Sequence, residues 1–89
     1  MPEISRFYGI VIRMFHERGG RHHVPHFHAE YQGLKASFAI DSLVILRGEF
    51  PTAQRRLVEA WAEIHRDELV NNWELLHSGR PGFKIEPLV

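Results

Sequence analysis

One stretch decides the fold of this chain: Pro25-His26-Phe27-His28-Ala29-Glu30-Tyr31-Gln32-Gly33-Leu34-Lys35-Ala36-Ser37-Phe38-Ala39-Ile40. Two segments in which polar and apolar residues alternate, residues 26–31 and 34–40, flank Gln32-Gly33. Glycine supplies the positive φ that a tight two-residue turn requires. Pro25 has no amide donor, so the first strand should begin after it. The stretch therefore predicts a β-hairpin.

The register of this hairpin follows from the length of its turn. A two-residue turn places Tyr31 opposite Leu34, and continued pairing then gives one face the apolar side chains of Phe27, Ala29, Tyr31, Leu34, Ala36, Phe38 and Ile40. The opposite face receives His26, His28, Glu30, Lys35 and Ser37, with Glu30 paired to Lys35 and His28 to Ser37. A slip of one residue would mix the two sets, so the register is well specified.

The same alternation turns two histidines away from the core. His26 and His28 are two residues apart on one strand, so their side chains lie on the same side. Residues 7–15 are β-branched and aromatic and predict another strand. Its core face would carry Ile10, Ile12 and Met14, and its histidine face Val11, Arg13 and Phe15. Residues 43–46 predict a further short strand, whose apolar run does not distinguish its two faces.

The C-terminal half is typical of helix. Residues 52–77 contain neither Gly nor Pro, and large apolar side chains recur at helical spacing, namely Leu57, Trp61, Ile64, Leu69, Trp73 and Leu76. Pro51-Thr52 is a suitable start and Ser78-Gly79 a suitable end. A single helix over this range would span about 39 Å, so one long helix and two helices, with a break at residues 65–67 and Asp67 as the second cap, are both open. Residues 83–89 alternate briefly and would add an edge strand.

Length and composition bound the molecule further. The 89 residues form one domain, residues 1–89, and the 11 basic residues balance the 11 acidic ones. Neutral charge argues against bulk electrostatic binding of nucleic acid. The absence of cysteine excludes disulfides and thiolate chemistry, and the lack of a signal-like or membrane-spanning segment predicts a cytoplasmic protein. Strands first and helix last predict an α+β fold: an antiparallel sheet of three to four strands packed on one long or two consecutive C-terminal helices.

The histidines near the hairpin suggest a metal site. Histidine is the commonest metal ligand, and His26 and His28 on one strand face could chelate a divalent ion with His23 as a third ligand. The alternative is an ordinary polar sheet face whose imidazoles hydrogen-bond to Ser37 and its neighbours.

Two other hypotheses use the same face. In the first, it is a binding surface for a small partner protein or for RNA or DNA, made of Arg13, Arg18, Arg21, His22, His23, His26, His28 and Lys35. In the second, His26 and His28 act as acid and base in RNA cleavage while Arg13 or Lys35 stabilises the phosphate charge. His65 is a third candidate for this chemistry, although its place beside the apolar stripe favours a half-buried, hydrogen-bonded side chain.

Several segments resemble one uncharacterised bacterial family, the domain of unknown function 4160. They are Ile4-Ser5-Arg6-Phe7-Tyr8-Gly9-Ile10, Pro25-His26-Phe27-His28-Ala29, His65-Arg66-Asp67-Glu68-Leu69, Asn72-Trp73-Glu74-Leu75-Leu76 and Ile85-Glu86-Pro87-Leu88. The resemblance implies a stand-alone bacterial protein, encoded beside another small protein in an arrangement similar to a toxin–antitoxin pair. It implies no particular activity.

Together these features favour a small binding or regulatory module that works with a partner protein. A ribonuclease or metal-dependent enzyme is the alternative. An open sheet edge would also allow pairing with a second copy of the chain.

Overall fold

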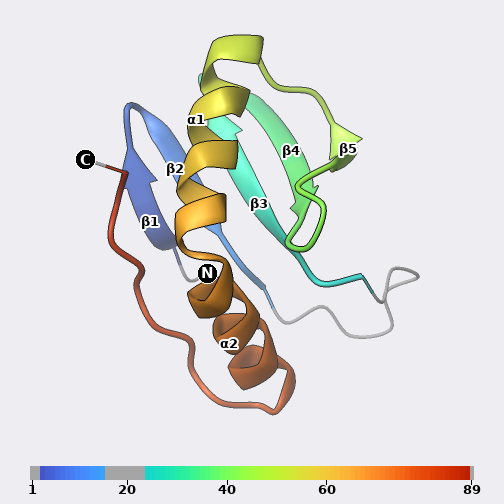
Figure 1. Ribbon diagram of the computed structural model, residues 1–89, viewed down its shortest axis with the longest axis vertical. Helices are drawn as coiled ribbons and strands as arrows, with labels where there is room; N and C mark the ends of the chain where they lie inside the picture. Colours follow the sequence, from blue (N-terminus) through green and yellow to red (C-terminus); the bar gives the residue numbers. More distant parts are fainter. Residues whose placement is uncertain (1–2, 16–23, 89) are drawn as a thin grey trace.

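The chain forms an antiparallel sheet followed by two helices in a computed structural model that describes residues 3–15 and 24–88. Its strands lie side by side in chain order: β1 (Glu3–Phe7), β2 (Ile10–Arg13), β3 (His26–Tyr31), β4 (Leu34–Ala39) and β5 (Ile45–Gly48). Figure 1 shows α1 (Thr52–Ile64) lying across one face of the sheet, with α2 (Arg66–His77) continuing past the end of the strands. The α+β class is confirmed, but the described residues form five strands where three to four were predicted.

The central hairpin has the predicted register. Tyr31 pairs with Leu34, His28 with Ser37 and Phe27 with Phe38. Its turn residues, Gln32 and Gly33, have φ of 47° and 82°. Two successive positive φ values are typical of a type I′ turn, whose twist matches that of the flanking strands.

The single strand predicted over residues 7–15 is wrong, because a turn divides it. Tyr8 and Gly9 have φ of 50° and 77°, which again indicates a type I′ turn. Residues of β1 therefore fold back and pair with β2. Tyrosine is an unusual residue at a positive φ, so the sequence carried no typical signal for a turn at this position.

The last strand begins later than predicted. Leu43 has φ 62° and its amide donates to the Ala39 carbonyl at 2.9 Å, so residue 43 lies in a turn and β5 starts at Ile45. Gly48 has φ 85°, and a Cβ there would stand 2.1 Å from the Lys35 carbonyl oxygen. This glycine lets β5 approach β4 closely.

The helical region follows the two-helix alternative. The break falls at His65, which is both the C-cap of the first helix and the N-cap of the second, with no side-chain cap bond at the second. The predicted capping role of Asp67 is therefore wrong, since Asp67 lies in the first turn of α2. The α2 end is a Schellman motif, in which Arg80 N–H donates to Leu75 O at 2.9 Å beside Gly79 at φ 81°. No helix in the described ranges is long and apolar enough to cross a membrane.

The core lies between α1 and the apolar face of the hairpin. Trp61 is fully buried, with its ring centroid 5.4 Å from that of Phe7 and 5.9 Å from that of Phe27. Phe27 in turn stacks on Phe38 at 5.4 Å. These contacts confirm that the aromatic residues of β3 and β4 face the helix, so the other sheet face carries the polar residues.

Residues 80–88 form a strap that runs from the end of α2 to β1 (Figure 1), where an edge strand was predicted over residues 83–89. Asn72, fully buried in α2, clamps the strap at Phe83: its Nδ2 donates to Phe83 O and its Oδ1 accepts from Phe83 N–H, both at 2.8 Å. Trp61 Nε1 donates to Glu86 O at 2.8 Å, and Ile85 N–H donates to Ile4 O at 2.7 Å. Only this last bond joins the strap backbone to β1 among the described residues, so no strand forms.

Candidate functional site

The sheet face turned away from α1 carries a row of polar side chains across four strands. In register, Arg13 of β2 lies beside His28 of β3, which lies beside Ser37 of β4, which lies beside Arg47 of β5. A second row runs from Arg6 through Val11 and Glu30 to Lys35. We call this surface the outer face; it comprises Glu3, Arg6, Val11, Arg13, His28, Glu30, Lys35, Ser37 and Arg47.

Both carboxylates of the outer face are bound by arginine. Arg13 Nε donates to Glu30 Oε2 at 3.0 Å, and Arg6 Nη2 donates to Glu3 Oε1 at 2.8 Å. The hydrogen bond from Arg6 lowers the pKa of Glu3, and the same bond raises the pKa of Arg6. Lys35 stands opposite Glu30 as predicted, but the ion pair forms with Arg13. Lys35 therefore has no ion pair among the described residues, and neither does Arg47.

His28 is the predicted histidine that remains on an accessible surface. It is half-buried, and its ring centroid lies 4.7 Å from that of Phe15. Its Nδ1 lies 3.4 Å from Ser37 Oγ, within hydrogen-bonding distance. These contacts agree with the expectation that an imidazole on this face bonds to Ser37.

His26 is placed differently from the prediction, which had its ring open to solvent. Only 6% of the residue is exposed, and its ring packs against the Trp73 indole with centroids 5.1 Å apart. Its Nδ1 lies 2.8 Å from Val24 O, so Nδ1 carries the hydrogen and donates it to that carbonyl. The prediction was wrong because α2 extends past the end of the sheet, where Trp73 covers the start of β3.

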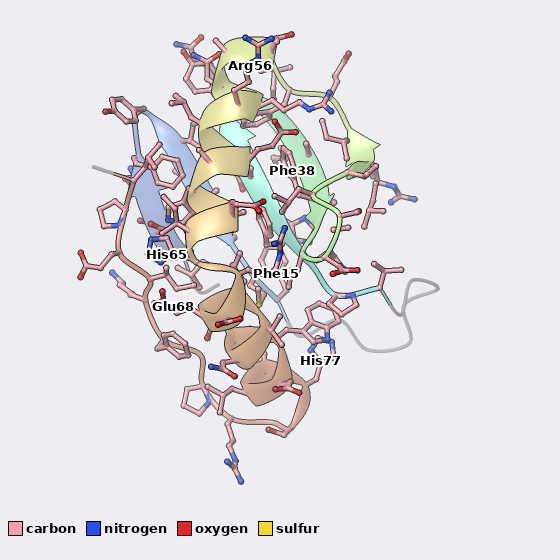
Figure 2. All side chains as sticks on the ribbon, viewed as in Figure 1. Phe15, Phe38, Arg56, His65, Glu68 and His77 are labelled. Carbon is pink, nitrogen blue, oxygen red and sulfur yellow. The ribbon has the colours of Figure 1, made fainter. Side chains whose placement is uncertain are left out.

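The three proposed catalytic residues are neighbours, because Arg13 lies beside His28 in register and the His26 and His28 rings are 5.2 Å apart, but each is engaged by other groups. Arg13 is held by Glu30 and His28 lies beside Phe15 and Ser37, while the burial of His26 keeps it from a substrate phosphate. His65 contacts Trp61, at 5.7 Å between ring centroids, on the side of the sheet that α1 covers. Its Nδ1 bonds Glu68 Oε1 at 2.5 Å, and Figure 2 labels both residues where α1 meets α2. His65 thus serves the helix junction.

Two of the three proposed metal ligands, His26 and His28, lie within the described residues. The rings of His26 and His28 lie 5.2 Å apart between centroids. His23, the third proposed ligand, lies outside the described residues, as do Arg18, Arg21 and His22 of the predicted binding surface. Within residues 3–15 and 24–88, no three histidine or carboxylate side chains gather in a group that could hold a metal ion.

Sequence reasoning missed Arg47 as a member of the outer face. The pairing of β4 with β5 shifts between Ser37 and Phe38, which indicates a bulge, and this bulge inserts Leu46 beside Arg47. Simple alternation therefore fails along β5. A basic residue directly after an apolar run was the one available signal.

Comparison with known proteins adds a family assignment. Residues 9–74 match the family model described as "Domain of unknown function (DUF4160)", a range that includes β2 to β5, α1 and most of α2. The comparisons with curated proteins and with solved structures gave no match. The matched range covers well over half of the 89 residues, and the chain therefore belongs to this family.

Proposed function

We propose that this chain is a cytoplasmic bacterial binding module that acts with a small partner protein as one component of a toxin–antitoxin-like pair. The outer face is its working surface. The observation that carries the proposal is the architecture of the sheet: α1 lies on the apolar face, α2 reaches the polar side at His26 through Trp73, and no described helix lies over the outer face (Figure 1). A sheet face with ordered side chains over which no described helix lies offers a partner a broad, preformed docking surface.

Binding suits this face better than catalysis does. Acid–base cleavage of RNA needs two titratable groups that reach one phosphate. His28 is accessible, whereas His26 is packed against Trp73 and donates to Val24 O. A pocket of ≈ 550 Å³ lies elsewhere, along α2 and the strap, and its lining residues are Asn71, Glu74, Leu75, Ser78, Arg80 and Phe83. None of these residues belongs to the outer face.

A protein partner suits the charge of the chain better than nucleic acid does. The formal net charge is +0, and two carboxylates stand among the cations of the outer face. Surfaces that bind nucleic acid normally carry a strong excess of positive charge. Mixed polar and apolar surfaces with arginine are common where proteins meet.

Co-purification with the product of the adjacent gene tests this proposal. The two proteins should elute together from a size-exclusion column, and expression of one alone should slow bacterial growth until the other is supplied. Ser37→Tyr places a bulky ring in the centre of the outer face and should abolish co-elution. Ala60→Tyr, an exposed site on α1, is the matched control and should leave it intact.

Circular dichroism would show that both variants are folded. A folded Ser37→Tyr protein that still co-elutes would refute the outer face as the docking surface. Separate elution of the natural pair would refute the partnership itself.

A further inference from the structure

The outer face has an uncompensated charge at one margin. It carries four cations (Arg6, Arg13, Lys35 and Arg47) and two carboxylates (Glu3 and Glu30). Both carboxylates are bound by arginine. The excess of two positive charges therefore resides at Lys35 and Arg47, both exposed, on the neighbouring strands β4 and β5.

The geometry of these two cations matches an extended acidic chain. Arg47 pairs in register with Ser37, and Ser37 is two residues from Lys35, so the cations are diagonal neighbours. Diagonal neighbours in an antiparallel pair have Cα atoms about 7–8 Å apart. In an extended strand, side chains that point the same way are two residues apart, or roughly 6.6–6.8 Å. Carboxylates at alternate positions of an extended segment can thus meet both cations at once.

An apolar contact lies directly beside this pair. Leu46 in the β5 bulge is 42% exposed, and Val44 is 53% exposed. A bound segment would cover these side chains together with the cations. Burial of apolar area would supply affinity, and the two ion pairs would supply orientation.

We propose that Lys35 and Arg47, with Ser37 between them and Leu46 beside them, bind an extended acidic segment of the partner protein whose carboxylates occupy alternate positions. This inference rests on the proposed function, because it names the chemistry of the partner that docks on the outer face.

Other occupants fit this margin less well. A second copy related by a two-fold axis would present the same patch to itself, which would set Lys35 and Arg47 against the same cations. Strand addition at β5 is opposed by its short length and its bulge, two features that protect sheet edges. Nucleic acid fits less well because the Glu30 carboxylate, near the centre of the face, would repel the phosphates of a bound strand.

The test compares two double charge reversals in complex formation with the adjacent gene's product. Lys35→Glu/Arg47→Glu reverses both cations of the margin. Arg56→Glu/Arg80→Glu is the matched control, because both arginines are exposed and have no ion pair among the described residues. Each reversal removes one positive charge and adds one negative, so both double variants move from a formal net charge of +0 to −4.

Isothermal titration should show an affinity about tenfold lower for Lys35→Glu/Arg47→Glu and little change for the control. The natural affinity should also fall as salt is raised. Replacing alternate acidic residues of the partner by lysine should restore binding to the reversed variant. If Lys35→Glu/Arg47→Glu binds normally while Ser37→Tyr does not, this inference fails and the proposed function stands. If both bind normally, both fail.

Defined probes separate protein from nucleic acid. One peptide with aspartate and valine in alternation, an isomer with the aspartates in one block, and a twelve-residue oligouridylate would each be titrated into labelled protein and followed by amide chemical shifts. The alternating peptide should shift Lys35, Ser37 and Arg47 more than its isomer does. Equal shifts from both peptides would overturn the spacing, and tighter binding of the oligouridylate at these residues would assign the margin to nucleic acid.

Discussion

The imidazole of His26 packs against the indole of Trp73, with ring centroids 5.1 Å apart, and so ties the first residue of β3 to the second helix. The His26 ring also donates to Val24 O at 2.8 Å. His26 thus contacts both Val24, just before β3, and Trp73 of α2. This contact assigns His26 to stability and leaves His28 as the accessible histidine of the pair.

Truncation should separate the two histidines. His26→Ala removes a buried ring contact and leaves the Val24 carbonyl without its donor, so we expect the free energy of unfolding to fall by about 1–3 kcal/mol. His28→Ala should cost less than about 1 kcal/mol, because the residue is only half-buried. Urea denaturation followed by circular dichroism measures both.

A double-mutant cycle would assign the His26 effect to its partner. His26→Ala combined with Trp73→Ala should show a coupling of about 0.5–1.5 kcal/mol. Equal costs for the two histidine variants, or additive costs in the cycle, would contradict the contact.

The strap depends on one buried amide. Asn72 makes two hydrogen bonds of 2.8 Å to the backbone of Phe83, and a Cβ on Gly82 would stand 2.5 Å from Asn72 Oδ1. Asn72→Ala should lower the free energy of unfolding by about 2–3 kcal/mol, since both bonds are lost in a buried site. Gly82→Ala should disturb the same bonds by steric conflict.

Hydrogen exchange would locate the damage. In both variants the amides of Phe83 and Ile85 should lose protection, while those of β3 keep it. Asn71→Ala is the matched control, because Asn71 is the exposed neighbour of Asn72 on the same helix. Undiminished protection of Phe83 in Asn72→Ala would disprove the clamp.

The hairpin was predictable because its information is local. Alternation along β3 and β4 and the glycine of the turn are consecutive in the chain, and together they admit one register. The sequence did not decide between one helix and two, because the apolar spacing over residues 52–77 fits both alternatives. The β1–β2 turn was not predicted, because Tyr8 has a positive φ, which tyrosine rarely adopts.

The features of the site that escaped prediction depend on distant segments. Trp73 is one of the apolar residues at helical spacing, so its position in the sequence predicts that it packs in the core. In the structure it instead packs against His26, past the end of the sheet. Register pairs Lys35 with Glu30, but Arg13 approaches Glu30 from β2 on the other side and forms the ion pair. Which of two cations binds one carboxylate depends on side-chain reach across three strands, and periodicity carries no information on that choice.

The turn of the central hairpin offers a clean test of backbone strain. Gly33 has φ 82°, and an added Cβ would meet nothing within 4 Å. Gly33→Ala should therefore lower the free energy of unfolding by about 1–2 kcal/mol through the left-handed backbone alone. Gln32→Asn should raise it by about 0.5 kcal/mol, because Asn-Gly is the preferred pair for a type I′ turn. Thermal denaturation would rank the variants, and a neutral Gly33→Ala would refute this turn geometry.

The pair of Glu3 and Arg6 gives the outer face a pH dependence of known sign. The hydrogen bond from Arg6 lowers the pKa of Glu3 below its usual value of 4.5, with a smaller electrostatic contribution from Lys84. A carboxyl whose pKa is lowered by folding stabilises the fold above its ordinary pKa, and that stabilisation is lost as pH falls through the folded value. Carbon-detected NMR titration should therefore place the Glu3 midpoint below 4.5 in the natural chain. Arg6→Met should move the midpoint up toward 4.5, and Lys84→Met should move it less; a midpoint that Arg6→Met leaves unchanged would show that the bond does not hold in solution.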